Sequence, residues 1–189
     1  MANIPGRGAT HNQASSRFNL AAREADGDWL DTVEAIDGPA QKLRTSVSLI
    51  TPRTIISRNA SPDIAFSQSI NAYAGCEHGC IYCFARPSHA YLNLSPGLDF
   101  ETRLIARPGI AEVLVGELRA KSYKVATVAI GTNTDPYQPI EADHRLMREV
   151  LEVLWAYRHP VAITTKGTLI ERDIEVRDMA GQKPHLRGR

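Results

Sequence analysis

Residues 71–86 read NAYAGCEHGCIYCFAR and contain every cysteine of this 189-residue chain. Cys76, Cys80 and Cys83 follow one another with the spacing C-x3-C-x2-C. Three thiols this close, with none elsewhere, indicate a single ligand set, because a disulfide framework would use an even number of cysteines spread along the chain. The glycine before each of the first two cysteines allows the tight backbone turns that would let three sulfurs converge.

The number of available ligands helps to distinguish which metal or cluster these thiols could bind. Thiolate sulfur suits zinc or an iron–sulfur cluster. Structural zinc sites usually have four ligands, and His78, cramped between two cysteines, is the nearby candidate for the fourth. Ferredoxin-type runs contain a fourth cysteine, which this chain lacks. Three thiolates on a four-iron cluster would leave one iron open for chemistry. Zinc and metal-free thiols remain the alternatives.

The composition is ordinary for a globular protein, with 43% hydrophobic and 23% charged residues. Lysines and arginines (22) nearly balance acidic residues (21), so the net charge of +1 does not support a nucleic-acid partner. The apolar runs are too short to cross a bilayer, and residues 1–8 contain no apolar signal core, which predicts neither membrane insertion nor export. Thiols that must stay reduced favour the cytoplasm.

The first 60 residues differ from the rest of the chain. Residues 1–18 are rich in Gly, Ser, Asn and Arg and show no helix or strand period. We therefore expect an irregular, partly flexible extension over residues 1–60. Residues 47–56 are rich in β-branched side chains but include Pro52, so any strand here is expected to be short or at a sheet edge.

From residue 61 onward, strand and helix patterns alternate. Residues 63–70, 125–130 and 161–165 are predicted strands, and the second is a continuous apolar run suited to a sheet buried on both faces. Helices are predicted to begin at Arg86 and to cover residues 109–121, 141–158 and 168–180. This order predicts an α/β fold with parallel strands and right-handed crossovers.

The predicted helix over residues 141–158 has the clearest amphipathic pattern. Its apolar face is expected to consist of Leu146, Val150, Leu154 and Tyr157. The side chains expected to face water are Glu141, Asp143, Arg145 and Arg148.

The loops after the three predicted strands contain the candidate site, because active sites in parallel α/β folds gather at the C-terminal ends of the strands. The cysteines follow the first strand. The second is followed by Thr132, Asn133, Thr134 and Asp135, which can accept hydrogen bonds from an ammonium group. Lys166 follows the third and places a cation where a carboxylate could bind. A simple turn and a surface lysine stay open as alternatives.

The cysteine motif, with the aromatic Tyr82 directly before the last cysteine, resembles the signature of radical S-adenosylmethionine enzymes. The surrounding sequence, SINAYAGCEHGCIYCFARPSHAYLNLSPGLDFE, resembles a bacterial branch related to spore photoproduct lyase, and the likeness covers residues 53–173. Spore photoproduct lyase uses a further cysteine near the end of its second strand as a hydrogen donor. Residues 131–134 offer none, so we do not expect its DNA lyase activity here.

The resemblance implies two cofactors, a 4Fe–4S cluster and S-adenosylmethionine. It implies that Cys76, Cys80 and Cys83 bind the cluster and that the amino and carboxylate groups of S-adenosylmethionine chelate the open iron. Lys166 would meet the carboxylate and Tyr82 the adenine. The amino group would meet the loop that contains Thr132, Asn133 and Asp135.

The activity implied by the resemblance is reductive cleavage of S-adenosylmethionine. An external electron donor of the flavodoxin or ferredoxin type would reduce the cluster, and the resulting 5′-deoxyadenosyl radical would abstract hydrogen from a substrate that the sequence does not identify. The cofactors would carry this chemistry, so no residue of the chain is assigned a catalytic role.

The resemblance also implies a partial (β/α) barrel of the radical S-adenosylmethionine type over residues 61–174. A complete (β/α)8 barrel takes about 250 residues. Residues 175–189 are basic and contain no strand pattern, so we expect a tail outside a truncated core, and poor turnover. The alternative function is a non-catalytic fragment that binds an iron–sulfur cluster or zinc through its cysteines.

Overall fold

The computed structural model describes residues 8–9, 12 and 44–174. These belong to two compact units, each described by itself. Unit 1 comprises Met1–Val47 and Gly75–Leu104, and unit 2 comprises Ser48–Ala74 and Ile105–Arg189. Most of the predicted N-terminal extension, the end of the predicted 168–180 helix and the predicted tail over residues 175–189 lie outside the described residues.

Unit 2 contains a four-stranded sheet with the order β2-β3-β6-β7. Strand β2 (Ile56–Arg58) is antiparallel to β3 (Gln68–Ile70), whereas β3 is parallel to β6 (Val128–Ile130) and β6 is parallel to β7 (Val161–Ile163). Strands β3 and β6 are buried along their whole length. The prediction of a mixed α/β fold with parallel strands is confirmed.

The strands are shorter than predicted. In the predicted strand 63–70, only the last three residues pair, because the preceding segment forms turns. The Ser61 N–H donates to Asn59 Oδ1 (3.0 Å), and the Asp63 N–H donates to Ser61 Oγ (3.4 Å). Such local side-chain bonds compete with the ladder of a strand.

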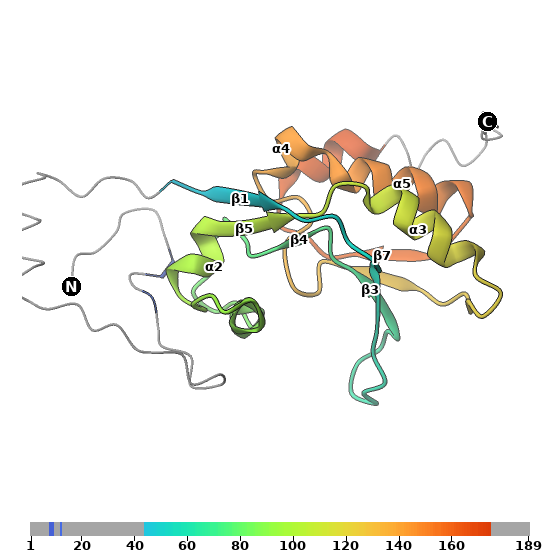
Figure 1. Cartoon of the computed structure of the whole chain (residues 1–189), viewed down its shortest axis with the longest axis horizontal. Helices are drawn as coiled ribbons and strands as arrows, with labels where there is room; N and C mark the ends of the chain where they lie inside the picture. The colour runs from blue at the N-terminus through green and yellow to red at the C-terminus, as the bar shows by residue number, and fades with distance from the viewer. Residues whose placement is uncertain (1–7, 10–11, 13–43, 175–189) are drawn as a thin grey trace, which may run out of the picture. The chain divides into compact units, whose positions relative to one another are not determined.

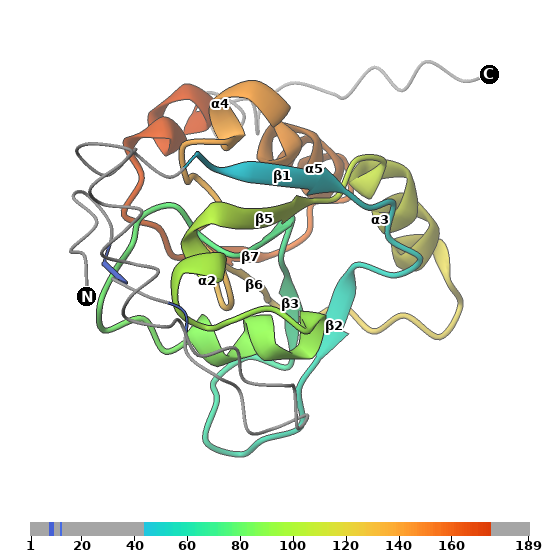
Figure 2. The same ribbon diagram turned by 60° about the vertical axis from the view of Figure 1, so that its left-hand side comes forward.

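Two helices cover one face of this sheet (Figures 1 and 2). Helix α3 (Ile110–Arg119) buries Ile110 and Leu114, and helix α5 (Leu146–Ala156) buries Val150 and Leu154 among others. The two helices pack against each other. Helix α3 therefore confirms the predicted helix 109–121, and α5 confirms its predicted apolar face except at Tyr157, which is 38% exposed.

The prediction of one helix over residues 141–158 is wrong. A short helix α4 (Glu141–His144) ends at Arg145, whose φ of 52° is left-handed, and α5 begins after it. Glu141, expected to face water, is fully buried. Its carboxylate accepts the Met147 N–H (3.2 Å) in the first turn of α5. The acidic side chain thus satisfies a free donor at the start of the second helix, which explains both the break and the burial.

A second sheet has the strand order β1-β5-β4. It consists of β1 (Ser46–Leu49), β4 (Tyr73–Ala74) and β5 (Arg103–Ala106), with β4 antiparallel to β5. Strands β1 and β2 flank Pro52; each is short and each lies at the edge of its sheet. This confirms the expectation for residues 47–56.

Unit 1 contains two short helical elements. The 3-10 helix η2 (Arg86–Leu92) has Pro87 in its first turn, as expected for the helix predicted to begin at Arg86. Helix α2 (Leu98–Thr102) buries Phe100 and Glu101. In unit 2, the predicted 168–180 helix is represented by the 3-10 helix η3 (Thr168–Asp173). Among the described residues, no helix has the length and apolar character needed to cross a bilayer.

Candidate functional site

Two glycines shape the backbone of the cysteine loop in unit 1. Gly75 has a φ of 78° and Gly79 a φ of 61°, so both are left-handed. A Cβ atom on Gly75 would lie 2.8 Å from the Phe100 carbonyl oxygen, which itself accepts the Cys76 N–H at 2.8 Å. The Cys83 N–H donates to the Cys80 carbonyl (3.2 Å) and closes a turn. The predicted tight turns before Cys76 and Cys80 are therefore present.

The three cysteines of the loop are free thiols. Cys76 is buried, whereas Cys80 and Cys83 are partly accessible. Cys83 packs against the buried group formed by Cys76, Ala85 and Phe100, so two of the thiols share one apolar environment. Among residues 8–9, 12 and 44–174, no three His, Cys, Asp or Glu side chains stand in an arrangement that could hold a metal ion.

The side chains between and beside the last two cysteines are apolar and exposed. Ile81, Tyr82 and Phe84 are 78%, 82% and 81% exposed. Isolated exposed apolar residues are common, but three in four positions form a concentrated apolar surface around two thiols. Tyr82, predicted to meet adenine, therefore has an accessible ring for stacking on a planar ligand.

Arg86 holds the Cys80 end of the loop. Its Nε and Nη2 atoms donate to the Cys80 carbonyl oxygen (3.1 and 2.9 Å), and Nη1 donates to the carbonyls of Pro96 and Gly97 (3.3 and 3.2 Å). Nη2 also forms an ion pair with Glu101, which is fully buried. The guanidinium is thus used within unit 1, and its function there is to fix the loop.

Buried His89 links η2 to the end of α2. Its Nε2–H donates to the carbonyl oxygen of Arg103 (2.9 Å), and its ring meets Phe100 edge to face with 5.3 Å between centroids. Burial lowers the pKa of His89 below the ordinary value of 6.5. The imidazole is therefore neutral in the folded chain near neutral pH.

We expect the free energy of unfolding to fall as the pH decreases below 6.5, because the unfolded state then binds a proton at position 89 that the folded state does not. The slope from this one group approaches about 1.4 kcal/mol per pH unit. Urea unfolding of wild type and His89→Gln between pH 5 and 8 measures it, since all other histidines are common to both proteins. Parallel curves for the two proteins would show that His89 is not the group responsible.

In unit 2, the structure places the predicted polar residues in the loops after β6 and β7. Asn71, directly after β3, joins the first of these loops: its Nδ2 donates to Thr132 Oγ1 (3.1 Å), and its Oδ1 accepts the Asn133 N–H (3.0 Å). Sequence reasoning missed Asn71 as a member of this group. The sequence feature that could have indicated this role is the position of Asn71 directly after a predicted strand.

The Asp135 carboxylate connects the loops after β6 and β7. It accepts hydrogen bonds from Thr165 Oγ1 (2.5 Å), the Lys166 N–H (2.9 Å) and the Tyr137 N–H (2.9 Å). Asp135 therefore organises the two loops, while the residue Lys166 is exposed. The structure thus brings the loops after β6 and β7 together at Asp135 and Lys166, as expected for loops at the same edge of a parallel sheet.

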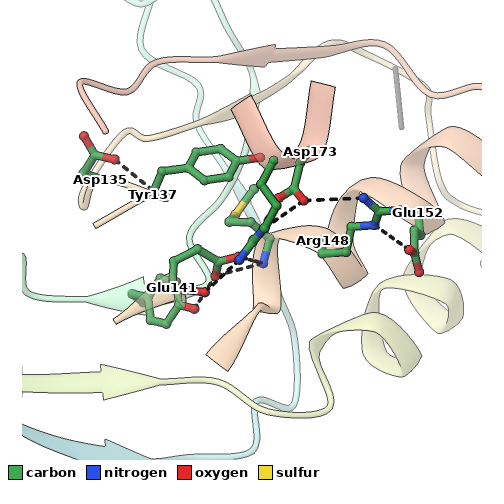
Figure 3. Close-up of polar contacts among 9 residues, drawn as sticks. Asp135, Tyr137, Glu141, Arg148, Glu152 and Asp173 are labelled. Carbon is green, nitrogen blue, oxygen red and sulfur yellow. Dashed lines mark hydrogen bonds and ion pairs between the residues drawn. The ribbon is translucent and has the colours of Figure 1, made fainter. Parts of the chain in front are cut away.

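In unit 2, a network of charged side chains includes the buried carboxylates of Glu141 and Asp173 (Figure 3). Glu141 accepts hydrogen bonds from Tyr73 Oη (2.5 Å) and Arg172 Nη2 (2.6 Å). Arg172 also pairs with Asp173 (2.9 Å), which Arg148 approaches at 3.6 Å. Burial, and then the neighbouring Glu141 carboxylate, raise the pKa of Tyr73, so its phenol remains a donor. The sequence pattern did not predict this network.

An apolar pocket of about 510 Å³ lies beside β7 in unit 2. Its walls include Leu154 and Trp155 of α5 and Val161 and Ile163 of β7, and Asp173 reaches its lining. None of the residues predicted to bind a cofactor lines this pocket.

The chain is similar to proteins whose names assign no activity. It is 46% identical over 120 residues to the uncharacterized protein Rv2578c of Mycobacterium tuberculosis (strain ATCC 25618 / H37Rv) and to the uncharacterized protein Mb2609c of Mycobacterium bovis. In each case the match covers 64% of this chain and 35% of the relative. It is also 27% identical over 108 residues to the uncharacterized protein MJ0683 of Methanocaldococcus jannaschii, a match that covers 57% of this chain and 38% of the relative.

The chain thus matches about a third of the length of these mycobacterial relatives. No family model matches the chain. No solved structure matches it either.

Proposed function

We propose that the chain is a radical S-adenosylmethionine protein that binds a 4Fe–4S cluster through Cys76, Cys80 and Cys83. The observation that carries this proposal is the loop itself: it contains three free thiols, all the cysteines of the chain, and no fourth. Such a set can hold a cluster and leave one iron open, which a four-thiolate set cannot.

The surroundings of the thiols fit such a group. Two left-handed glycines turn the backbone before the first two cysteines. Cys83 packs against the buried group of Cys76, Ala85 and Phe100, and the exposed Ile81, Tyr82 and Phe84 neighbour Cys80 and Cys83 in the sequence. The apolar groups around a metal site influence its solvent access and the reduction potential of a cluster. When bound, the cluster would supply the electron for reductive cleavage of S-adenosylmethionine, and hence a radical for hydrogen abstraction from a substrate.

The parallel strands of unit 2 support the second half of the proposal. The loops after β6 and β7 are joined by Asp135 and present Thr132, Asn133 and Lys166. We propose that this edge binds the amino and carboxylate groups of S-adenosylmethionine, that Tyr82 stacks on its adenine, and that β3, β6 and β7 belong to a partial (β/α) barrel. An external flavodoxin- or ferredoxin-type donor would supply the electron, in the reducing cytoplasm.

The test is iron and acid-labile sulfide analysis of the full chain after anaerobic reconstitution, together with its absorption spectrum. We expect about four iron and four sulfide per chain, the composition of a 4Fe–4S cluster. Stoichiometric zinc in the protein as isolated, with no uptake of iron and sulfide, would contradict the proposal and favour the alternative of a non-catalytic zinc-binding chain.

Replacing Lys166 by alanine is expected to weaken binding of S-adenosylmethionine by about 1.5–3 kcal/mol, the range for a hydrogen bond to a charged group. The loop should persist, because Asp135 accepts the backbone N–H of residue 166, which the substitution retains. Calorimetry on the reconstituted protein measures the dissociation constant.

The matched control for this prediction is Lys121→Ala, since Lys121 is an exposed lysine that follows α3 and precedes β6, away from the strand ends that carry the loops. Its dissociation constant should equal that of wild type. Equal affinities of the Lys166→Ala and Lys121→Ala variants for S-adenosylmethionine would show that Lys166 is a surface lysine that does not contact this cofactor.

A further inference from the structure

A short segment near the N-terminus lies against the cysteine loop in unit 1. The backbone N–H groups of Gly8 and Ala9 donate to the two oxygens of the Glu101 carboxylate, at 3.1 and 2.9 Å. These contacts join residues more than 90 positions apart in the sequence. Glu101 is fully buried, so its charge requires such donors in the folded chain.

Asn12 attaches the same segment to the start of α2. Its Oδ1 accepts the Asp99 N–H (2.9 Å), and its Nδ2 donates to Asp99 Oδ1 (3.1 Å). The residue that precedes α2, Gly97, has no side chain to cap the helix. Asn12 therefore supplies from a distance the cap that the local sequence lacks.

The contacts continue from Glu101 to the cysteines. Glu101 forms an ion pair with Arg86, and the same guanidinium nitrogen donates to the Cys80 carbonyl oxygen at 2.9 Å. Removing the donors on one side of Glu101 would leave a buried carboxylate with fewer partners and would draw Arg86 away from Cys80. The segment, the ion pair and the loop are thus one connected set of charge-assisted hydrogen bonds.

Gly8 also touches the loop directly. A Cβ atom at this position would lie 1.6 Å from the Gly79 carbonyl oxygen, a backbone atom that cannot move without moving the loop. Residue 8 must therefore lack a side chain for the segment to lie where it does. The composition of residues 1–18 predicted an irregular extension and gave no indication of this contact.

We infer that the segment containing Gly8, Ala9 and Asn12 is part of the metal-binding site: it positions the Cys80–Cys83 turn through Glu101 and Arg86. They are positioning residues, since the proposed ligands are the three cysteine thiolates. The inference rests on the proposed function for the presence and the identity of the metal. The restraint on the two cysteines is a property of the metal-free chain and is measured separately.

The experiment compares Gly8→Ala with Gly116→Ala in the full chain. Both add one methyl group, but a Cβ at Gly116, on the exposed side of α3, meets no atom within 4 Å. The first readout is the rate of iodoacetamide alkylation of each cysteine in the metal-free protein, resolved by mass spectrometry. We expect Gly8→Ala to raise the alkylation rates of Cys80 and Cys83 about tenfold, because it would open the loop locally around these two residues. The alkylation rate of buried Cys76 should stay unchanged. General unfolding would raise all three rates.

The second readout is the rate of iron release from the reconstituted protein to a chelator. We expect this rate to be about tenfold faster in Gly8→Ala than in Gly116→Ala, because a less restrained site loses its metal more readily.

Asn12→Ala loosens the segment without steric conflict and should change both readouts in the same direction by a smaller factor. This second variant keeps the test decisive if Gly8→Ala fails to fold. Alkylation and release rates that are equal in Gly8→Ala, Asn12→Ala and Gly116→Ala would overturn the inference. If wild type takes up no iron and sulfide, the proposed function fails, and the alkylation rates alone still decide the inference.

Discussion

Replacing any one of Cys76, Cys80 and Cys83 by alanine is expected to abolish the visible absorption of the reconstituted cluster and to reduce iron and sulfide to background. The chain has no fourth thiol that could replace a missing ligand. A two-thiolate set leaves two irons without protein ligands. The expected loss is therefore complete at each position, not graded.

The matched control for the cysteine substitutions is His78→Ala, in the same loop. His78 lies between the first two cysteines and is the nearby candidate for a fourth zinc ligand. If the site holds a cluster on three thiolates, His78→Ala retains iron and sulfide. If the site holds zinc with four ligands, His78→Ala loses the metal as completely as the cysteine variants do. A triple cysteine variant that still binds stoichiometric iron and sulfide would contradict the assignment of the ligands.

Replacing Glu141 by alanine is expected to reduce the free energy of unfolding by about 3 kcal/mol, the lower end of the range for breaking a buried ion pair. The substitution removes the acceptor for three donors, namely Tyr73 Oη, Arg172 Nη2 and the Met147 N–H. Tyr73 is itself buried, so its hydroxyl would be left without this acceptor. Urea denaturation followed by circular dichroism measures the change.

Glu152→Ala is the control for this prediction. Glu152 is an exposed carboxylate on α5 that pairs with Arg148 at 2.7 Å, four positions away. Exposed pairs of this kind contribute about 0.3–0.5 kcal/mol. The two variants thus remove the same chemical group from a buried and an exposed ion pair. Similar losses for the two variants would show that burial of Glu141 does not have the energetic consequence proposed.

The order of strands and helices in unit 2 could be predicted from the sequence, because local hydrophobic patterns determine where these elements form. The apolar run that ends at Ile130 forms β6, which is parallel to β3 and β7. The helical spacing of Leu146, Val150 and Leu154 corresponds to α5. The parallel order also predicted that Asp135 and Lys166 would lie near each other, and they do. These inferences need only periodicity and topology.

The same patterns could not predict features made by single long-range contacts. Glu141 has a position on the polar side of a helical wheel, yet it is buried because its carboxylate serves donors from β4, α5 and η3. Gly8 has no periodic neighbours, and its role follows from a contact with Gly79. The burial and contacts of such residues depend on which distant segments meet after folding, and a local sequence pattern does not contain this information.

The electron paramagnetic resonance spectrum of the reduced, reconstituted chain, recorded with and without S-adenosylmethionine, shows directly whether this cofactor ligates an open iron of the cluster. Direct ligation of an open iron by the amino and carboxylate groups must change the signal, because it changes the coordination of one iron in the cluster. We therefore predict a shift in g values that saturates with S-adenosylmethionine and is absent when methionine alone is added at the same concentration. A reduced cluster whose spectrum stays the same at saturating S-adenosylmethionine would contradict the account.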